Sequence, residues 1–403
     1  MSDVLSSSTE RAERCPVRHF DGGSTKHVDA DPFATLADFR EVEPFWTSDD
    51  PTESDGYWVV TRFDQVREVQ QDYTTFSHAN VDPRYAANPL MPTMFDPPDQ
   101  VKQRGIVLPL LTPAAIAPLE PRMHAVCREL ISSFVARGGC DVVAEFSRRY
   151  PIAIFGELYG LPEDRREEFR QLAEMFLHEE GRQHEAWTQI IAIMRDEIEQ
   201  RRTTPRDDML NGISHGRIDG DLISIDEAVN LASTVFIGGL DTLPSNIGWT
   251  LRYLADHPEQ RRLLVEQPQL IPGAVEEFFR VFPVVVRNAM VHATRDVEFH
   301  GANIRKGDGV FTFLALANLD SAAFDDPLRI DFARPRNRHV AFSIGSHRCL
   351  GSHLARHELA VALEEWLTAI PDFWIADQGR VVYHGGPVFS LGALPLEWPS
   401  SSS

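Results

Sequence analysis

Apolar residues at three- and four-residue spacing run through the middle of this chain, from Asp99 to about Gln267. This spacing predicts a succession of amphipathic helices. The pattern is clear at Leu119, Met123, Val126, Leu130, Ile131 and Phe134. Thr204-Pro205 and the segment from Gly212 to Gly220 interrupt it. We therefore expect a mainly α chain with small sheets at its edges.

Shorter elements surround that helical region. Residues 31–45 have helical spacing, residues 57–61 resemble a strand followed by a short helix, and residues 284–315 are rich in strand and turn patterns. The last helix is expected from Leu350 to Ile370. The proline-rich stretch from Thr74 to Pro98 is long and irregular, as functional lids are. We expect a single large helical domain with small peripheral β-sheets over residues 31–398, a flexible arm at 1–30 and a frayed tail at 399–403.

Charge and cysteine content narrow the class of protein. The 403 residues carry 39 Lys and Arg against 60 Asp and Glu, a net charge of −21. Such an acidic chain is not expected to bind nucleic acid or an anionic membrane surface. The four cysteines are too scattered for a disulfide framework, and no signal peptide or apolar run of membrane-spanning length is evident. A cytoplasmic protein with reduced thiols is the consistent expectation.

The segment from Phe342 to Gly351 (FSIGSHRCLG) carries the most chemical information. Cys349 precedes an amphipathic helix, and the partial positive charge of a helix N-terminus favours the thiolate. Gly345 and Gly351 would let a flat group approach, which suits an axial iron ligand. A buried structural cysteine is the alternative for a lone thiol. A zinc site is another, because the segment offers the potential ligands His347, Cys349, His353 and His357.

The pattern FxxGxHxCxG resembles the ligand loop of the cytochromes P-450. Three other elements of that family occur in the right order: Asp96-Pro97-Pro98 followed by Arg104, Gly238-Gly239-Leu240-Asp241-Thr242, and Glu277-Phe278-Phe279-Arg280. The resemblance covers residues 31 to 398 and looks closest to the bacterial camphor 5-monooxygenase subgroup. It implies the cytochrome P-450 fold, a haem b cofactor with Cys349 as the iron ligand, Phe342, Gly345 and Gly351 in the loop that holds it, and monooxygenase activity.

The segment from Ile223 to Tyr253 is predicted to be a long apolar helix with a local opening. Gly238 and Gly239 weaken it, and Pro244 removes the hydrogen bond that the Leu240 carbonyl would accept. Thr242 can place its hydroxyl on the Gly238 carbonyl, four residues back. By the family resemblance, Asp241 and Thr242 deliver protons during oxygen activation.

Further site residues follow from the resemblance. Gln100, Arg104 and His347 match positions that bind haem propionates. The family's next propionate arginine aligns with Ala289, so either Arg287 reaches a propionate from a shifted register or that contact is missing. Glu277 and Arg280 are implied to be a buried structural pair that holds the coil before Cys349, through Arg334 or Arg336.

The substrate pocket is inferred by the same alignment. Its positions are mostly small or aliphatic: Asn88, Thr93, Thr234, Ile237, Gly238, Val285 and Val388. They suit a small, weakly polar substrate such as a terpenoid ketone, ether or alcohol. Core packing is the alternative role for each position. An aromatic or fatty substrate, epoxidation, and a haem-binding sensor without turnover are the alternative functions.

Electrons must come from a separate protein, because no GxGxxG follows a strand to mark a fused reductase. The resemblance implies a [2Fe–2S] ferredoxin with its own reductase. Lys102, Arg104, Arg348 and Arg356 are expected to cluster near the cysteine face of the haem, as a docking site for that acidic partner.

Overall fold

The computed structural model describes residues 27–28, 31–48, 56–79, 86–179, 181–386 and 388–399. Most of this chain is helical, as the spacing predicted. The helices are α2 (Pro32–Thr35), α3 (Phe63–Gln71), α4 (Asp99–Val107), α5 (Pro113–Ile116), α6 (Glu120–Phe134), α7 (Arg149–Tyr159), α8 (Arg166–His178), α9 (Gln183–Thr203), α10 (Met209–Ser214), α11 (Ile225–Leu240), α12 (Thr242–Asp256), α13 (Pro258–Glu266), α14 (Ile271–Val281), α15 (Leu314–Ala317) and α16 (Ser352–Ala369).

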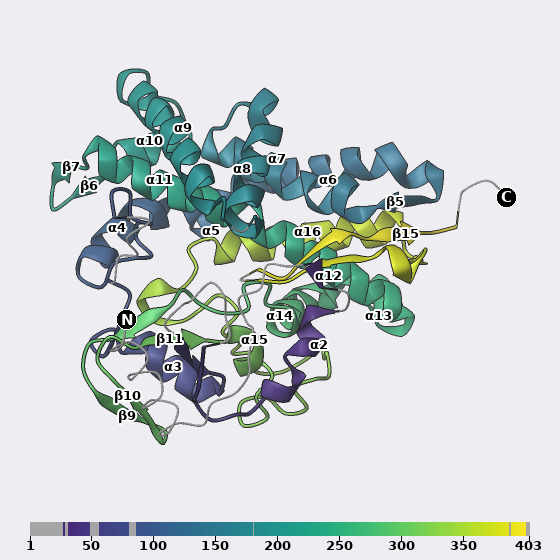
Figure 1. Ribbon diagram of the computed structural model, residues 1–403. Helices are drawn as coiled ribbons and strands as arrows, with labels where there is room; N and C mark the ends of the chain where they lie inside the picture. Colours follow the sequence, from purple (N-terminus) through teal and green to yellow (C-terminus); the bar gives the residue numbers. More distant parts are fainter. Residues whose placement is uncertain are drawn as a thin grey trace.

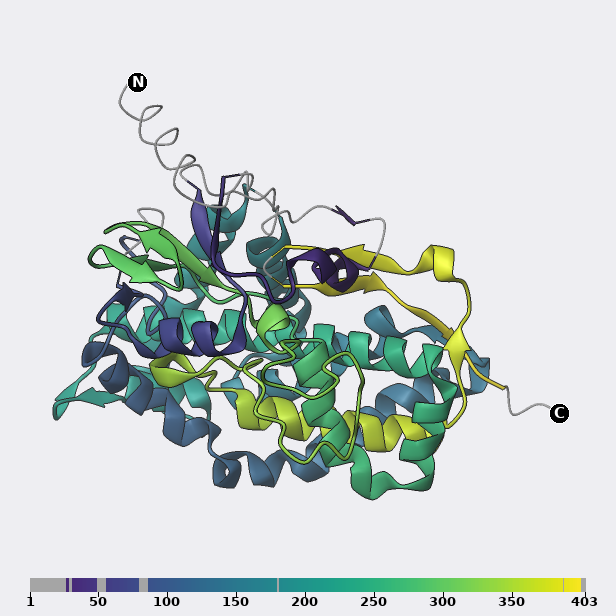
Figure 2. The same ribbon diagram turned by 90° about the horizontal axis from the view of Figure 1, so that it is seen from below.

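Short strands form the edges of the molecule. They are β1 (His27–Val28), β2 (Phe45–Thr47), β3 (Tyr57–Val60), β4 (Phe76–Ser77), β5 (Gly139–Asp141), β6 (Arg217–Ile218), β7 (Asp221–Leu222), β8 (Val291–Ala293), β9 (Val297–Phe299), β10 (Ala302–Ile304), β11 (Gly309–Thr312), β12 (Trp374–Ile375), β13 (Val382–His384), β14 (Ser390–Ala393) and β15 (Pro395–Glu397). The largest sheet has the order β2-β3-β11-β8-β4, and β3 and β11 pair in parallel. Figure 2 shows the β9–β10 hairpin and the C-terminal strands at opposite ends of the molecule.

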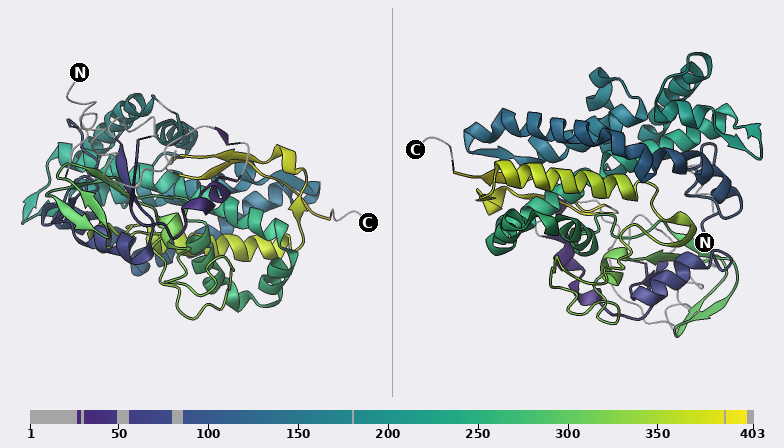
Figure 3. Two further views of the ribbon diagram at one scale, coloured as in Figure 1. Left: turned by 60° about the horizontal axis from the view of Figure 1, so that its bottom comes forward. Right: turned by 180° about the vertical axis from the view of Figure 1, so that it is seen from behind.

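Helices α6 to α11 lie on one side of the molecule, and the β9–β11 region lies on the other (Figure 1). In Figure 1, α6 to α11 form the upper part, while α3, α15 and β9 to β11 form the lower part. The reverse view in Figure 3 shows α16 running between these two parts. Helix α11 begins with a capping box, in which the Ser224 side chain and Glu227 satisfy each other's backbone N–H groups. It leads the chain into the buried centre, where most of α12 is also enclosed.

Two predicted elements differ from the structure at the N-terminal end. The helix expected over residues 31–45 is wrong beyond Phe39: α2 ends at Thr35, and only a 3₁₀ turn at Ala37–Phe39 follows. Phe45 instead joins β2 and pairs with Val59, and Pro44 disfavours helical geometry in the residue before it. In the segment predicted to be a flexible arm, His27–Val28 pair with β13. The rest of 1–30, and Ser400–Ser403 of the predicted tail, lie outside the described residues.

Candidate active site

One cavity brings together the cysteine loop and the opening in the central helix. Thr242 and Gly238 line one wall of it, and Cys349, Gly351 and Phe342 line another. Much of the remaining wall is apolar, including Leu111, Phe155, Val235, Leu243 and Leu354. Polar groups also line it: Gln70, His78, Arg104, Asn288 and His347. Residues more than 200 positions apart in the sequence therefore share one internal space.

The cysteine loop is held by its own backbone. The Cys349 N–H donates to the Phe342 carbonyl at 2.8 Å, and the Ser343 N–H donates to the Val340 carbonyl at 2.8 Å. Ser343 adopts a left-handed conformation with φ +58°, which is uncommon for a residue other than glycine. The Phe342 ring packs on Phe279 at a centroid distance of 4.7 Å. This loop presents the thiol of Cys349 to the cavity.

The electrostatics of this thiol differ from the sequence expectation. Burial raises the pKa of Cys349, and this outweighs the Gly351 N–H and the nearby Arg104, which lower the pKa. Helix α16 begins only at Ser352, three residues further on, and the dipole effect is confined to the terminal turn. Burial around the sulfur therefore opposes the thiolate form, while the Gly351 N–H and the arginines favour it.

The two glycines of the loop have different roles. A side chain at Gly351 would have the Cys349 sulfur, 4.0 Å away, as its nearest neighbour, so Gly351 leaves the space beside the sulfur open. Gly345 has φ +76°, and a Cβ there would lie 2.7 Å from the Gln70 carbonyl oxygen. Gly345 is thus required by the turn and by α3, and it is not among the described residues that line the cavity.

The central helix opens where the sequence predicted. Helix α11 ends at Leu240 and α12 begins at Thr242, with Asp241 between them in a non-helical conformation. The Thr242 hydroxyl donates to the Gly238 carbonyl at 3.2 Å, which is the expected hydrogen bond. The Thr242 side chain is thereby fixed beside the cavity that Cys349 also lines.

Gly238 and Gly239 both line the cavity, but their surroundings differ. A Cβ on Gly239 would lie 2.3 Å from the Phe155 ring, so this glycine allows α7 to pack closely against α11. A Cβ on Gly238 would meet nothing within 4 Å, because Gly238 faces the cavity. Asp241 does not line that cavity; it borders a separate, very small void together with Arg148 and Ser245. Asp241 and Thr242 are therefore adjacent in sequence but face different spaces.

Of the four residues expected at the propionates, three lie at or beside the cavity and one, Arg287, does not. Arg104 and His347 line the cavity, and Gln100 lies beside them, where its side chain donates to the Ser346 carbonyl at 2.6 Å. Arg104 also donates to the Arg348 carbonyl at 2.7 Å. Burial, reinforced by nearby positive charge, lowers the pKa of His347 to about 3. The His347 Nε2 atom and the Gln100 Oε1 atom are buried and have no hydrogen-bond partner among the described residues.

The structure does not bring Arg287 to this cavity. Its guanidinium lies over the Phe311 ring, 3.6 Å from the centroid, and its backbone bridges to Phe313. The described residues that line the cavity include its neighbours Asn288 and Ala289 instead. Of the two possibilities open from the sequence, a missing arginine contact agrees with this geometry.

Four of the seven expected substrate positions line the cavity: Thr93, Thr234, Gly238 and Val285. The other three do not. Ile237 is buried in the core, Val388 pairs with Val285 through a backbone bridge, and the Asn88 carbonyl accepts a hydrogen bond from Trp187 at 3.0 Å. Asn88 therefore meets α9 through its backbone.

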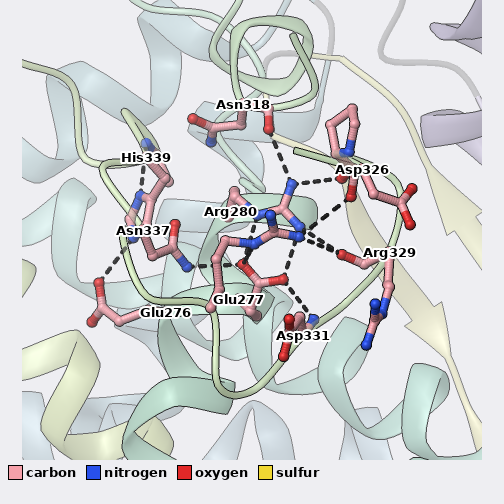
Figure 4. Close-up of polar contacts among 12 residues, drawn as sticks. Glu276, Glu277, Arg280, Asn318, Asp326, Arg329, Asp331, Asn337 and His339 are labelled. Atoms are coloured by element: carbon pink, nitrogen blue, oxygen red, sulfur yellow. Dashed lines mark hydrogen bonds and ion pairs between the residues drawn. The ribbon is translucent and has the colours of Figure 1, made fainter. Parts of the chain in front are cut away.

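Glu277 and Arg280 form an ion pair with no exposed surface. The Arg280 Nε and Nη2 atoms donate to the two carboxylate oxygens at 2.7 and 2.8 Å. The carboxylate also accepts hydrogen bonds from Arg334, the Asn337 side chain and the Asp331 backbone, and Arg280 donates to the carbonyls of Asn318, Pro327 and Arg329 (Figure 4). The pair thus holds the coil that leads into the cysteine loop, and Arg334, one of the two expected partners, takes part.

Several polar cavity residues were not identified from the sequence, among them three with a possible role at the site. His78 follows β4, Asn288 precedes Ala289, and Glu358 lies on α16. Burial raises the pKa of Glu358 well above its usual range. Only the helical spacing of Glu358 from Leu354 could have placed it on the inner face of α16; nothing local marks the other two.

The zinc alternative finds no support in the structure. Within the described ranges, no three His, Cys, Asp or Glu side chains are grouped closely enough to hold a metal ion. The His357 Nε2 atom instead lies 3.3 Å from a carboxylate oxygen of Glu120. No helix in the described part of the chain combines the length and the apolar character needed to cross a bilayer.

Comparison with known proteins agrees with this site. The family model described as Cytochrome P450 matches residues 167–369. The chain is 32% identical over 393 residues to a probable cytochrome P450 127A1 of Sinorhizobium fredii, covering 95% of this chain and 94% of that protein. It is 33% identical over 347 residues to a mycinamicin IV hydroxylase/epoxidase of Micromonospora griseorubida, covering 83% and 87% of the two chains.

Solved structures show the same fold. The crystal structures of CYP101J2 and CYP101C1 match with TM-scores of 0.85 and 0.86 and identities of 32% and 34%, each covering 96% of this chain and 98% of the other. Fold and site together define a haem-thiolate monooxygenase. The chain belongs to the cytochrome P450 family, and the expected resemblance, fold class and enzyme class are confirmed.

The family's cofactor is haem b with a cysteine thiolate ligand, and the residues present fit this group. The thiol of Cys349 opens onto a largely apolar cavity, and Gly238 and Gly351 leave open space beside α11 and beside the sulfur. Near Arg104, the buried nitrogen of His347 and the oxygen of Gln100 lack partners. Such unpartnered buried atoms indicate that a polar group of a ligand belongs there.

Proposed function

We propose that this chain hydroxylates a C–H bond of a small, terpenoid-like substrate with dioxygen and two electrons from a separate [2Fe–2S] ferredoxin. The observation that carries the proposal is that Cys349 and Thr242 line one largely apolar cavity from different elements. Within it, Cys349 is the iron ligand, and Arg104, Gln100 and His347 hold the propionates. Bound through the thiolate, haem supplies the electronic push that favours cleavage of the O–O bond.

Protons for this chemistry come through the broken helix. The Thr242 hydroxyl donates to the Gly238 carbonyl, so its oxygen can accept a hydrogen bond from a group in the cavity. It delivers a proton when its own hydrogen turns from the carbonyl to the cavity and its oxygen takes up another proton from the relay. Asp241 borders a different space, the small void shared with Arg148, so in this proposal it passes protons to Thr242 by turning its carboxylate across the helix break. Helix α11 ends at Leu240 and α12 begins at Thr242. At this break some backbone N–H and C=O groups make no helical hydrogen bond, so they can bond to members of the relay.

The proposed substrate class rests on the wall composition. Val285 and Thr93 are short side chains, and the Thr234 hydroxyl is occupied by the Asn230 carbonyl at 3.1 Å, so the wall offers little strong polarity. Relatives are named for larger substrates: a mycinamicin IV hydroxylase/epoxidase and a vitamin D(3) 25-hydroxylase. We propose a smaller substrate for this chain, because the large side chains of Leu111, Phe155 and Leu243 also line the cavity and take up space in it.

Titration with a panel of monoterpenoids, followed by the ferric spin state, tests the substrate class. We expect at least one monoterpenoid alcohol, ether or ketone to shift the iron to high spin and to give a hydroxylated product with ferredoxin and reductase. A response confined to fatty acids, aromatics or macrolides would contradict the proposal.

The ferredoxin surface is proposed with fewer residues than the sequence indicated. Lys102 is paired with Asp219 at 2.5 Å, Arg356 with Glu276 at 2.5 Å, and Arg104 lines the cavity. Arg348 and Arg338 are exposed and line one surface hollow next to the cysteine loop. These two arginines are the proposed contacts for an acidic partner, since local positive potential speeds its association.

Arg348→Glu should slow reduction by the ferredoxin, and the effect should grow as the salt concentration falls. Arg380→Glu makes the same charge change at an exposed residue near the C-terminal strands and should leave the rate unchanged. Equal rates for the two variants would remove Arg348 from the docking site.

A further inference from the structure

The polar end of the cavity is short of positive charge for the cofactor it must hold. Haem b carries two propionate carboxylates. Among the described residues that line the cavity, Arg104 is the one lysine or arginine side chain, and Glu358 is the one carboxyl group. Arg287 lies over Phe311, and Ala289 offers no polar group in its place. Buried carboxylates need hydrogen-bond donors, so other side chains must supply them.

His78 is placed to be such a donor. It is 7% exposed, it lines the cavity, and its Nδ1 atom is buried without a hydrogen-bond partner in the described chain. Its ring stacks on that of His347, with 3.8 Å between centroids and 29° between planes. Both imidazoles therefore lie at the same end of the cavity as Arg104.

The backbone on either side of His78 is fixed by a single carboxylate. The His78 N–H donates to Asp96 Oδ1 at 3.0 Å, and the Ser77 hydroxyl donates to Asp96 Oδ2. Asp96 comes three residues before α4, which also carries Arg104. These contacts tie β4 to the start of α4 and hold the ring of His78 against His347. A ring whose backbone is fixed in this way, and whose Nδ1 atom has no partner in the described chain, is pre-organised to bind a ligand group.

We propose that His78 donates an N–H hydrogen bond to a haem propionate, beside His347 and Arg104. The proposal rests on the proposed haem-thiolate function and adds a residue of this chain to it. A neutral imidazole carries one N–H group, so it can make this bond without being protonated. The stacking of His78 on His347 then orients two donors toward the carboxylates where the chain lacks a second arginine.

Loss of haem to an acceptor protein tests this role without measuring turnover. Haem transfer from the ferric holoenzyme to excess apomyoglobin should be about ten-fold faster for His78→Phe, which keeps a ring for stacking but has no N–H, because a hydrogen bond to a charged group is lost. His78→Gln retains a donor and should fall between this variant and the unmodified protein. The infrared or resonance Raman bands of the propionates should shift in His78→Phe.

His292→Phe is the matched control. His292 is half-buried on β8, and it lies close enough to His78 to lower the pKa of His78 electrostatically. It is not among the described residues that line the cavity. It should hold haem as the unmodified protein does. Haem loss from His78→Phe at the unmodified rate, or equally fast loss from both phenylalanine variants, would overturn the role of His78. Absence of thiolate-bound haem from the unmodified protein would instead refute the proposed function itself.

Discussion

Replacing Glu277 by glutamine removes the negative charge from an ion pair whose two side chains have no exposed surface. The carboxylate receives five hydrogen bonds, two of them from Arg280 and one each from Arg334, Asn337 and the Asp331 backbone. A glutamine has nearly the same shape, but its NH₂ group would face donors rather than acceptors. The Arg280 charge would remain buried without its counter-charge.

The structure sets the size of the effect. Removing one partner of a buried ion pair costs about 3–5 kcal/mol of unfolding free energy. Arg334 would also lose its carboxylate, which places Glu277→Gln toward the upper end of that range. Because this network holds the coil before Cys349, the variant should lose thiolate ligation before it unfolds globally.

Glu276→Gln is the matched control, one residue away. Glu276 is 29% exposed and bonds to His339 and Arg356 at 3.0 and 2.5 Å, so solvent screens its charge and the loss should be about 1–2 kcal/mol. Guanidinium unfolding of the holoproteins, followed by tryptophan fluorescence and by the Soret band under carbon monoxide, measures both quantities. Equal midpoints for Glu277→Gln and the unmodified protein would refute the argument that this pair stabilises the loop.

Three other predictions follow from the site and its surroundings. Gly238→Ala should fold normally but weaken binding of haem or substrate, because its methyl group enters open space in the cavity. Gly239→Ala should instead destabilise the protein by about 1–3 kcal/mol, because its methyl group clashes with Phe155. Equal effects of the two variants on stability would contradict this prediction. Thr242→Ala should keep haem and substrate but divert electrons to peroxide, and unchanged coupling of electrons to product would remove Thr242 from the relay. Burial opposes the ionisation of Glu276, but hydrogen bonds from His339 and Arg356 lower its pKa to about 2. The contribution of this carboxylate to the free energy of unfolding should be complete above about pH 4.5 and lost as the pH falls toward 2. A Glu276→Gln variant with the same pH dependence of stability would refute this.

Local sequence rules predicted the parts of the site that depend on near neighbours. The hydrogen bond from Thr242 to Gly238 follows from four-residue spacing, and the helix break follows from Gly238, Gly239 and Pro244. The strand at residues 57–60 and the helices starting at Phe63 and Ser352 also agree with their patterns within a few residues.

Contacts between distant segments could not be predicted in the same way. Gly345 is fixed by the carbonyl of Gln70, and Arg287 by the ring of Phe311. Lys102 appeared to belong to a basic patch, but Asp219, more than 100 residues away, pairs with it. The burial that raises the pKa of the Cys349 thiol likewise depends on the whole fold. His78 shows the same limit, because only the folded chain places it on His347.

Cys349 must ligate the haem iron through its sulfur for the proposed chemistry to occur, and the absorption spectrum of the reduced protein under carbon monoxide tests this ligation directly. The unmodified protein should show the red-shifted Soret band of thiolate-bound haem, and Cys349→His should bind haem without that band. A colourless protein, or a spectrum that is the same in both proteins, would contradict the account.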